Sequence, residues 1–301
     1  MRVASVLMVL CFIALAPLTP AGAKGKKDSA PPPPDRALIQ EDIASGLSQM
    51  DQGLSSAEDL SPEEEYYLGR AVAANILKRY APYQGNPELT AYLNQICGAL
   101  VVNSPQPTWF NGYHLILLDT EEINAFATPG GHIFITRGLA EAVDSEDTLA
   151  AVIAHELAHI HRRHGAALIK DMRLTEDLSA SADRVLRIAG RGASPEDPMR
   201  LLTGQIRELV NVLVVNGYSQ AQEFEADAEA LSLLASAGYT PASLIEVLQI
   251  LERTQGTHPG GLNATHPPPA LRIANAEKTL HQYLVPDTRS FRLDRYIPLT
   301  P

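Results

Sequence analysis

A short segment in the middle of the chain, "AVIAHELAHIHRRHG" at residues 151–165, places four histidines and one glutamate in an apolar, helical pattern. An α-helix turns by about 100° per residue, so His155 and His159 share one face and Glu156 lies at its flank. Two imidazoles at this spacing predict a metal site, and Zn²⁺ suits such ligands. The pattern H-E-x-x-H also places Glu156 where it can take a proton from water on that metal.

The other two histidines of the segment, His161 and His164, point away from this face if the helix continues. They stand beside Arg162 and Arg163. We therefore interpret them as part of a basic, solvated helix end, where positive charge is favourable against the helix dipole.

A catalytic zinc site needs a third protein ligand and an open position for water. A histidine six residues after His159 would mark one large group of zinc proteases, but that position is Gly165. The best candidate segment is "EFEAD" at 223–227, where Glu223 and Asp227 are four residues apart and share a helix face. We expect Glu223 to bind the metal and Asp227 to accept a hydrogen bond from a ligand histidine. The alternative is an acidic, solvated helix face, and Glu225 is expected on the surface.

The N-terminus reads as a secretory signal peptide over residues 1–23. Arg2 precedes the apolar run "VASVLMVLCFIALAP", which ends in "AGA". An uncleaved membrane anchor is the alternative, although the run is shorter than the roughly 20 residues that span a bilayer. We therefore expect an exported protein, periplasmic in a Gram-negative source. Export leaves Cys97 without a partner cysteine, and we expect it to be buried.

Hydrophobic periodicity predicts one α+β domain over residues 61–285, with a small mixed sheet packed against a mainly helical C-terminal part. Residues 24–60 read as a flexible linker and N-terminal segment, and residues 286–301 as a C-terminal tail. Helices are expected from Ser61 onward and near 87–103, followed by strands at 113–120 and on both sides of "PGG". Further helices follow at 146 onward, 219–238 and 241–254. The segment 166–217 is read as two helices that form a lid, a partner surface or ordinary packing.

Four segments in this order resemble the M48 family of zinc metallopeptidases: "NAFATPGGHIFITRGL" (124–139), "HELAH" (155–159), "EFEAD" (223–227) and "THPPPALRI" (265–273). The resemblance covers roughly residues 65–285. It implies a gluzincin-like fold, one Zn²⁺ per chain bound by His155, His159 and Glu223, and endopeptidase activity. It also implies that His266 faces the metal. His266 then either donates a hydrogen bond to the oxyanion or binds zinc in a resting state, and Arg272 is expected to pair with the acidic helix.

Peptidases of this general fold have a sheet-edge strand beside the cleft, and we assign that role to His132, Ile133, Phe134 and Ile135. Such an edge predicts extended or unfolded protein substrates. The formal charge of −11 argues against nucleic acid as a partner. Peripheral association with membrane or envelope proteins stays open. The main alternative function is a protein-binding chaperone or holdase with a latched zinc site. Hydrolysis of a non-peptide substrate is a third.

Overall fold

The computed structural model describes residues 60–171, 206–254, 262, 266–283, 285–286 and 288–297. The predicted signal peptide (1–23), the linker segment up to residue 59 and the stretch 172–205 lie outside the described residues. Within the described ranges, no helix combines the length and the apolar character that crossing a bilayer requires.

Two helices precede the sheet, and each begins where the sequence predicts. In α2 (Pro62–Arg79), the Ser61 hydroxyl accepts a hydrogen bond from the backbone N–H of Glu64, and the Glu64 carboxylate accepts one from the N–H of Ser61. In α3 (Pro87–Val102), Asn86 caps the first turn. The free Cys97 lies on α3 and is buried, as predicted.

The sheet is small and mixed, with the strand order β1-β3-β2. The strands are β1 (His114–Leu118), β2 (Ala125–Thr128) and β3 (His132–Thr136). β3 pairs with β1 in parallel and with β2 antiparallel. The tight turn between β2 and β3 depends on Gly130 and Gly131, whose φ angles of 76° and 99° favour glycine. The α+β class is confirmed.

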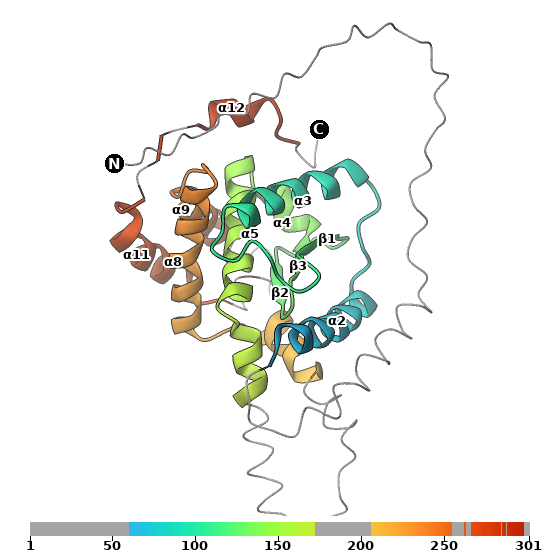
Figure 1. The fold of residues 1–301 in the computed structure, drawn as a ribbon. Coiled ribbons are helices and arrows are strands. Elements are labelled where there is room, and N and C mark those ends of the chain that lie inside the picture. Colours follow the sequence, from blue (N-terminus) through green and yellow to red (C-terminus); the bar gives the residue numbers. More distant parts are fainter. Residues whose placement is uncertain are drawn as a thin grey trace, which may run out of the picture.

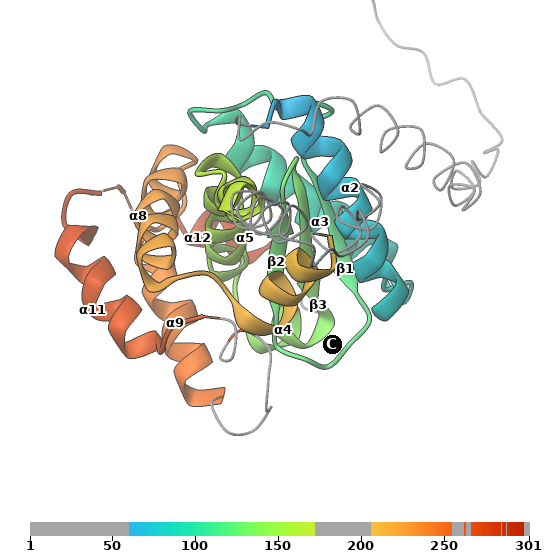
Figure 2. The ribbon, with the colours of Figure 1, turned by 90° about the horizontal axis from the view of Figure 1, so that it is seen from below.

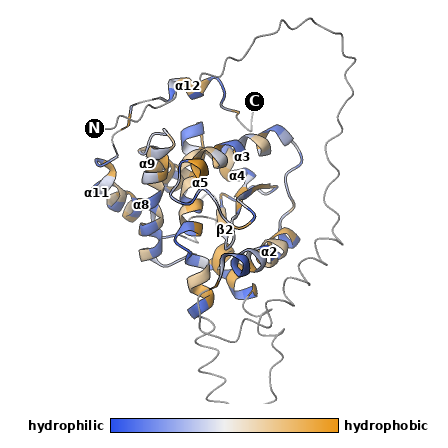
Figure 3. Ribbon diagram, in the orientation of Figure 1, coloured by the Kyte–Doolittle hydropathy of each residue, from blue (hydrophilic) through white to orange (hydrophobic). Residues whose placement is uncertain are grey.

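The helix α5 (Glu146–His161) runs through the centre of the molecule, and all of its residues are buried. The sheet and α3 lie on one side of α5, and the helices α8, α9 and α11 lie on the other (Figures 1 and 2). Their bounds are α8 (Gln220–Ser236), α9 (Ser243–Thr254) and α11 (Pro269–Leu280). The hydropathy colouring of Figure 3 shows the apolar character of much of α5, as expected for a helix enclosed on all sides.

The second face of the sheet is covered by α2. There Phe126 and Phe134 pack against Leu68, Val72 and Ile76 in a separate apolar cluster. The sequence did not predict the short helix α4 (Arg137–Ala142) near this sheet. The π-helix η1 (Val212–Asn216) lies within the segment 166–217 that was predicted to be helical.

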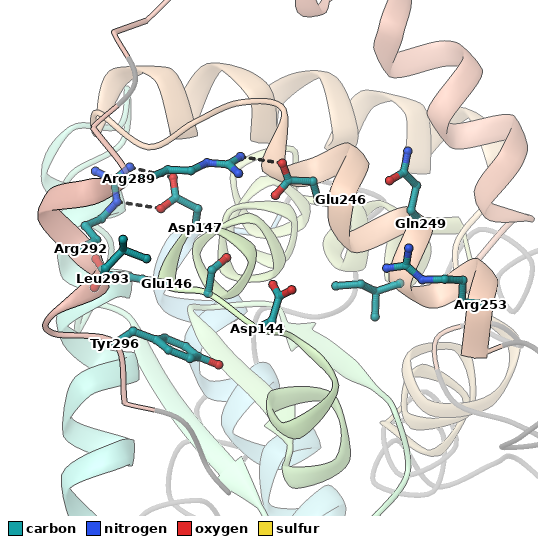
Figure 4. Close-up of a pocket in the computed structure, with 12 residues that line it drawn as sticks. Asp144, Glu146, Asp147, Glu246, Gln249, Arg253, Arg289, Arg292, Leu293 and Tyr296 are labelled. Carbon is teal, nitrogen blue, oxygen red and sulfur yellow. Dashed lines mark hydrogen bonds and ion pairs between the residues drawn. The ribbon is translucent and has the colours of Figure 1, made fainter. Parts of the chain in front are cut away.

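The C-terminal segment packs against the start of α5. It contains the short helix α12 (Ser290–Leu293), and Arg292 forms two hydrogen bonds of 2.8 Å with the carboxylate of Asp147. Arg295 pairs with Glu146. Figure 4 shows Arg292, Arg289 and Tyr296 around a pocket that α9 and the beginning of α5 complete. The described part of the predicted tail is therefore attached to the domain.

Candidate metal centre

The buried face of α5 carries the first two predicted ligands. The Nε2 atoms of His155 and His159 lie 3.1 Å apart, and both rings are almost fully buried. The capping box of Ser145 and Thr148 fixes the start of α5, and continuous helix from Glu146 to His161 then brings the two imidazoles to one face.

The third predicted ligand comes from α8, which packs along α5. Ser219 caps α8, and Glu223 lies in its first turn with no exposed surface. One carboxylate oxygen of Glu223 (Oε2) lies 3.4 Å from Nε2 of His155, and the other (Oε1) lies 3.6 Å from Nε2 of His159. The structure thus brings all three predicted ligands together.

His266, on the loop before α11, joins this group. Its Nδ1 atom lies 2.5 Å from Oε2 of Glu223. One ligand atom from each of His155, His159, Glu223 and His266 falls within 4.8 Å of the others. The loop histidine therefore occupies a fourth position around the same point.

The donor set fits zinc. In a tetrahedral site with Zn–N bonds of about 2.0–2.1 Å, neighbouring ligand atoms are separated by about 3.3 Å. The separations of 3.1, 3.4 and 3.6 Å among His155, His159 and Glu223 bracket that value. Imidazole nitrogen and carboxylate oxygen are also ligands that zinc prefers. A His/His/Glu/His group of this kind is consistent with a zinc peptidase.

Asp227 contacts the ring nitrogen of His155 that faces away from the metal position. Its Oδ1 atom lies 3.1 Å from Nδ1 of His155, so this ring can turn Nε2 toward the metal position. Arg272 of α11 binds both oxygens of Asp227, at 2.6 and 2.9 Å. Burial alone would raise the pKa of Asp227, but the Arg272 guanidinium and His155 together hold that pKa below its usual value. The expected pairing of Arg272 with the acidic helix is present.

Glu156 is placed where a proton acceptor would be. Its side chain is buried, and its Oε1 atom has no hydrogen-bond partner among the described residues. Burial raises the pKa of Glu156 to about 7. A small cavity beside it is lined by Ala125 and Ala127 of β2, and by His159, Tyr218 and His266.

Two predictions about the neighbouring histidines were wrong. His161 and His164 are buried rather than solvated. Nδ1 of His161 lies 2.8 Å from Oε1 of Glu229 on α8, and Nδ1 of His164 lies 2.8 Å from Nδ1 of His159. The continuous-helix geometry fails at His164 because α5 ends at His161 and the chain turns at the next two residues. His161 is still part of α5, and it is buried because α8 covers it.

The predicted substrate strand is also corrected. His132, Ile133, Phe134 and Ile135 belong to β3, which has a hydrogen-bonded neighbour on each side and is buried. An extended peptide cannot pair with a central strand, so β3 is not the edge beside the cleft. The outer edge of β1 is closed as well, because the Asn94 side chain bonds the N–H and C=O of Leu115 at 3.2 and 3.0 Å.

The free edge of the sheet belongs to β2. The N–H of Thr136 donates to the C=O of Asn124 at 3.0 Å, and alternation along an antiparallel ladder then points the backbone groups of Ala125 and Ala127 away from β3. Within the described part of the chain, no backbone hydrogen bond reaches these outward groups. They border the cavity that Glu156 and His266 also line.

Sequence reasoning missed Tyr218. Its ring stacks on that of His159, with centroids 4.5 Å apart and planes 18° from parallel. It follows Gly217, whose φ is 76°, at the end of η1. Tyr218 lies outside the metal-binding motifs, and no sequence pattern around it marks an aromatic residue that stacks on a ligand histidine.

Comparison with known proteins agrees with this geometry. The model of peptidase family M48 matches residues 87–280. The beta-barrel assembly-enhancing protease of Escherichia coli (strain K12) is 30% identical over 237 residues, which cover 77% of this chain and 47% of that protein. Metalloprotease LoiP of the same strain is 29% identical over 197 residues, covering 65% of this chain and 70% of LoiP. The mitochondrial metalloendopeptidase OMA1 of Schizosaccharomyces pombe is 32% identical over 160 residues, covering 52% of this chain and 43% of OMA1.

The chain therefore belongs to peptidase family M48, as the four motifs predicted. It spans about half the length of the beta-barrel assembly-enhancing proteases that it matches.

Proposed function

We propose that the chain is a zinc-dependent endopeptidase that hydrolyses peptide bonds of exported proteins that are unfolded or misassembled. The observation that carries this proposal is the position of Glu156. Its buried carboxyl group, with one oxygen unbonded among the described residues, follows the ligand His155 directly and lines the same cavity as His159 and His266. A purely structural metal site has no use for such a group.

Each residue of the centre then has one task. His155, His159 and Glu223 would hold the ion, which supplies Lewis acidity that polarises the scissile carbonyl and acidifies water. Glu156 takes the proton of the attacking water and returns it to the leaving amine. Asp227 and Arg272 keep His155 in the orientation that its role requires.

The outer edge of β2 supports a preference for extended substrate. A peptide that adds a strand there would bond to the outward backbone groups of Ala125 and Ala127, next to Glu156. Recognition through backbone groups depends little on side chains, which suits unfolded protein. Ala125 and Ala127 are buried beneath η1 and Tyr218, so binding requires this cover to shift.

The proposed compartment is the exported side of a membrane, periplasmic in a Gram-negative source. It rests on the predicted signal peptide and on the likeness to a beta-barrel assembly-enhancing protease. Peripheral contact with membrane or envelope proteins is part of the same proposal. The acidic charge of −11 opposes a nucleic-acid partner.

A second candidate function is a holdase with a latched zinc site. One observation favours it: His266 occupies a fourth position in the ligand group, at 2.5 Å from Glu223. A site closed by four protein ligands has no open position for water, and closed sites are typical of structural zinc.

Cleavage of casein, an unfolded protein, separates the two candidates. We expect the zinc-loaded wild type to cut casein and the Glu156→Gln variant to leave it intact while keeping its zinc and its thermal midpoint. If neither protein cuts casein, but both suppress aggregation of a heated client equally, the holdase replaces the peptidase. Equal cleavage by both proteins would remove Glu156 from the chemistry.

A further inference from the structure

We propose that His164 is a positioning residue for the metal ligand His159, and that it links His159 to the carboxylate of Glu225. The inference rests on the proposed role of His159 in holding zinc. It assigns a task to a histidine that lies outside the H-E-x-x-H motif.

The first observation is a direct contact between the two rings. Nδ1 of His159 lies 2.8 Å from Nδ1 of His164, and the opposite nitrogen of His164, Nε2, lies 3.4 Å from Oε2 of Glu225. Both rings are buried, whereas more than half of the Glu225 side chain is exposed. A chain of three side chains therefore runs from the metal position to the surface of α8.

The chemistry of imidazole orders the protons along this chain. A neutral imidazole that binds metal through Nε2 carries its proton on Nδ1. With Nε2 of His159 facing His155 and Glu223, its Nδ1–H donates to Nδ1 of His164. His164 must then carry its own proton on Nε2, which faces the Glu225 carboxylate. Each N–H in this series of three side chains therefore faces an acceptor.

The backbone is built to bring His164 to this place. α5 ends at His161, and Arg163 adopts a φ of 55°, in the left-handed region. For a residue other than glycine, this conformation costs about 1–2 kcal/mol. The turn redirects the chain, so His164 returns to the side of α5 that carries His159. Without it, a continued helix would place the two rings about 140° apart.

Contacts on both sides keep the turn in this conformation. The Arg163 guanidinium bonds the buried carboxylate of Glu65 and the C=O of Leu60. After the turn, a methyl group at Gly165 would lie only 2.8 Å from Cγ of Pro129. Arg163 is strained but is held by an ion pair with a buried carboxylate, and position 165 admits only glycine unless neighbouring atoms move. These two features together indicate that the turn has a specific purpose.

The two metal-binding histidines are thus supported in parallel ways. Asp227 contacts Nδ1 of His155 directly, and Glu225 reaches Nδ1 of His159 through His164. Tyr218 stacks on the face of the His159 ring and limits its tilt. Removing such supporting contacts typically lowers metal affinity by about 10–100-fold.

Two substitutions of similar polarity separate positioning from packing. In His164→Asn, the amide oxygen stands where Nδ1 stood and can still accept from His159. In His164→Gln, the oxygen stands nearer the former Nε2 and the acceptor is lost. We measure zinc dissociation constants by competition with a chromophoric chelator. We expect His164→Gln to weaken zinc binding about tenfold or more and His164→Asn to stay within about threefold of the wild type.

His161→Gln is the matched control, because this buried histidine one turn earlier binds Glu229 and does not contact His159. It should lower the thermal midpoint without changing zinc affinity. The visible spectrum of cobalt-substituted protein gives a second readout, and only His164→Gln should alter it. Equal zinc affinity in wild type and His164→Gln, or equal losses in Asn and Gln variants, would overturn the inference. A wild type that binds no zinc would instead overturn the proposed function.

Discussion

Nδ1 of His266 lies 2.5 Å from Oε2 of Glu223, so a loop histidine meets a helix carboxylate inside the group that would hold the metal. His266 also lines the cavity that contains Glu156 and the outer edge of β2. We propose that in this position His266 closes the site that a substrate must enter. The sequence allowed His266 to be either an oxyanion donor or a latch, and the direct contact with the predicted ligand Glu223 leads us to propose the latch.

Removal of the latch should raise activity. We expect His266→Ala to cleave casein roughly tenfold faster than the wild type, because a closed state favoured by about 1.4 kcal/mol leaves only a tenth of the molecules competent. Initial rates at saturating zinc measure this effect. His281→Ala, at the exposed end of α11, is the control and should match the wild type. A loss of activity in His266→Ala would show that His266 supports the oxyanion instead.

The Asp227–Arg272 pair should control both zinc affinity and stability. Asp227→Asn keeps the size of the side chain but removes the charge that orients His155, and we expect zinc affinity to fall about 10–100-fold. Arg272→Ala leaves the buried carboxylate of Asp227 without its cationic partner, which should lower the free energy of unfolding by about 3–5 kcal/mol. Chelator competition and urea denaturation measure the two effects. Unchanged zinc affinity in Asp227→Asn would contradict the orienting role.

Proline substitutions in β2 test the proposed substrate edge. The N–H of Ala127 points away from β3, so Ala127→Pro removes a donor that no backbone acceptor uses among the described residues and that a substrate could use. We expect KM for an unfolded substrate to rise roughly tenfold, the loss of about one hydrogen bond, while zinc content stays the same. Phe126→Pro is the contrasting variant. It removes a bond within the sheet and should destabilise the fold. Normal cleavage by a folded Ala127→Pro protein would exclude this edge.

The C-terminal contacts should make the domain sensitive to acid. Burial alone would raise the pKa of Asp147, but the hydrogen bonds from Arg292 hold that pKa below its usual 3.8. For Glu146, the contacts from Arg295, Tyr92 and Tyr239 likewise outweigh burial and hold the pKa below 4.5. Carboxylates with lowered pKa values stabilise the folded state above their ordinary pKa, and this contribution disappears as the pH falls through the folded value.

Arg292→Ala should therefore be most destabilising at neutral pH. The pair that it breaks is buried on both sides, and we expect a loss of about 3–5 kcal/mol at pH 7 that shrinks below pH ~4. Urea denaturation across the pH range measures it. Arg289→Ala breaks the half-exposed pair with Glu246, also visible in Figure 4, and should cost less than about 1 kcal/mol. A constant difference between Arg292→Ala and wild type at all pH values would contradict the assignment.

The local parts of the structure could be predicted from sequence because their causes are local. The capping residues Ser61, Ser145 and Ser219 mark helix starts, and four-residue spacing puts His155 with His159 and Glu223 with Asp227. The prediction that His164 continues the helix failed because one backbone angle, the φ of Arg163, redirects the chain. That angle depends on contacts with Glu65 and Leu60, about a hundred residues earlier, and no sequence pattern near Arg163 indicates these contacts.

The order of the strands could not be predicted from the sequence, for a similar reason. The turn between β2 and β3 is visible in "PGG", but the parallel pairing of β1 with β3 joins segments separated by β2. Because β1 pairs with β3, β3 is the central strand of the sheet and not an edge strand. Both strands of the turn read as apolar, so periodicity alone could not choose between them.

Zinc stoichiometry is the measurement that decides whether α5 and α8 form a metal centre. We expect about one zinc per chain in the wild type and in Glu156→Gln, and almost none in Glu223→Ala, at a free zinc concentration that just saturates the wild type. This outcome would establish that α5 and α8 together form the site and that Glu156 is not a ligand. Full zinc in Glu223→Ala, or none in the wild type, would contradict the metal centre described above.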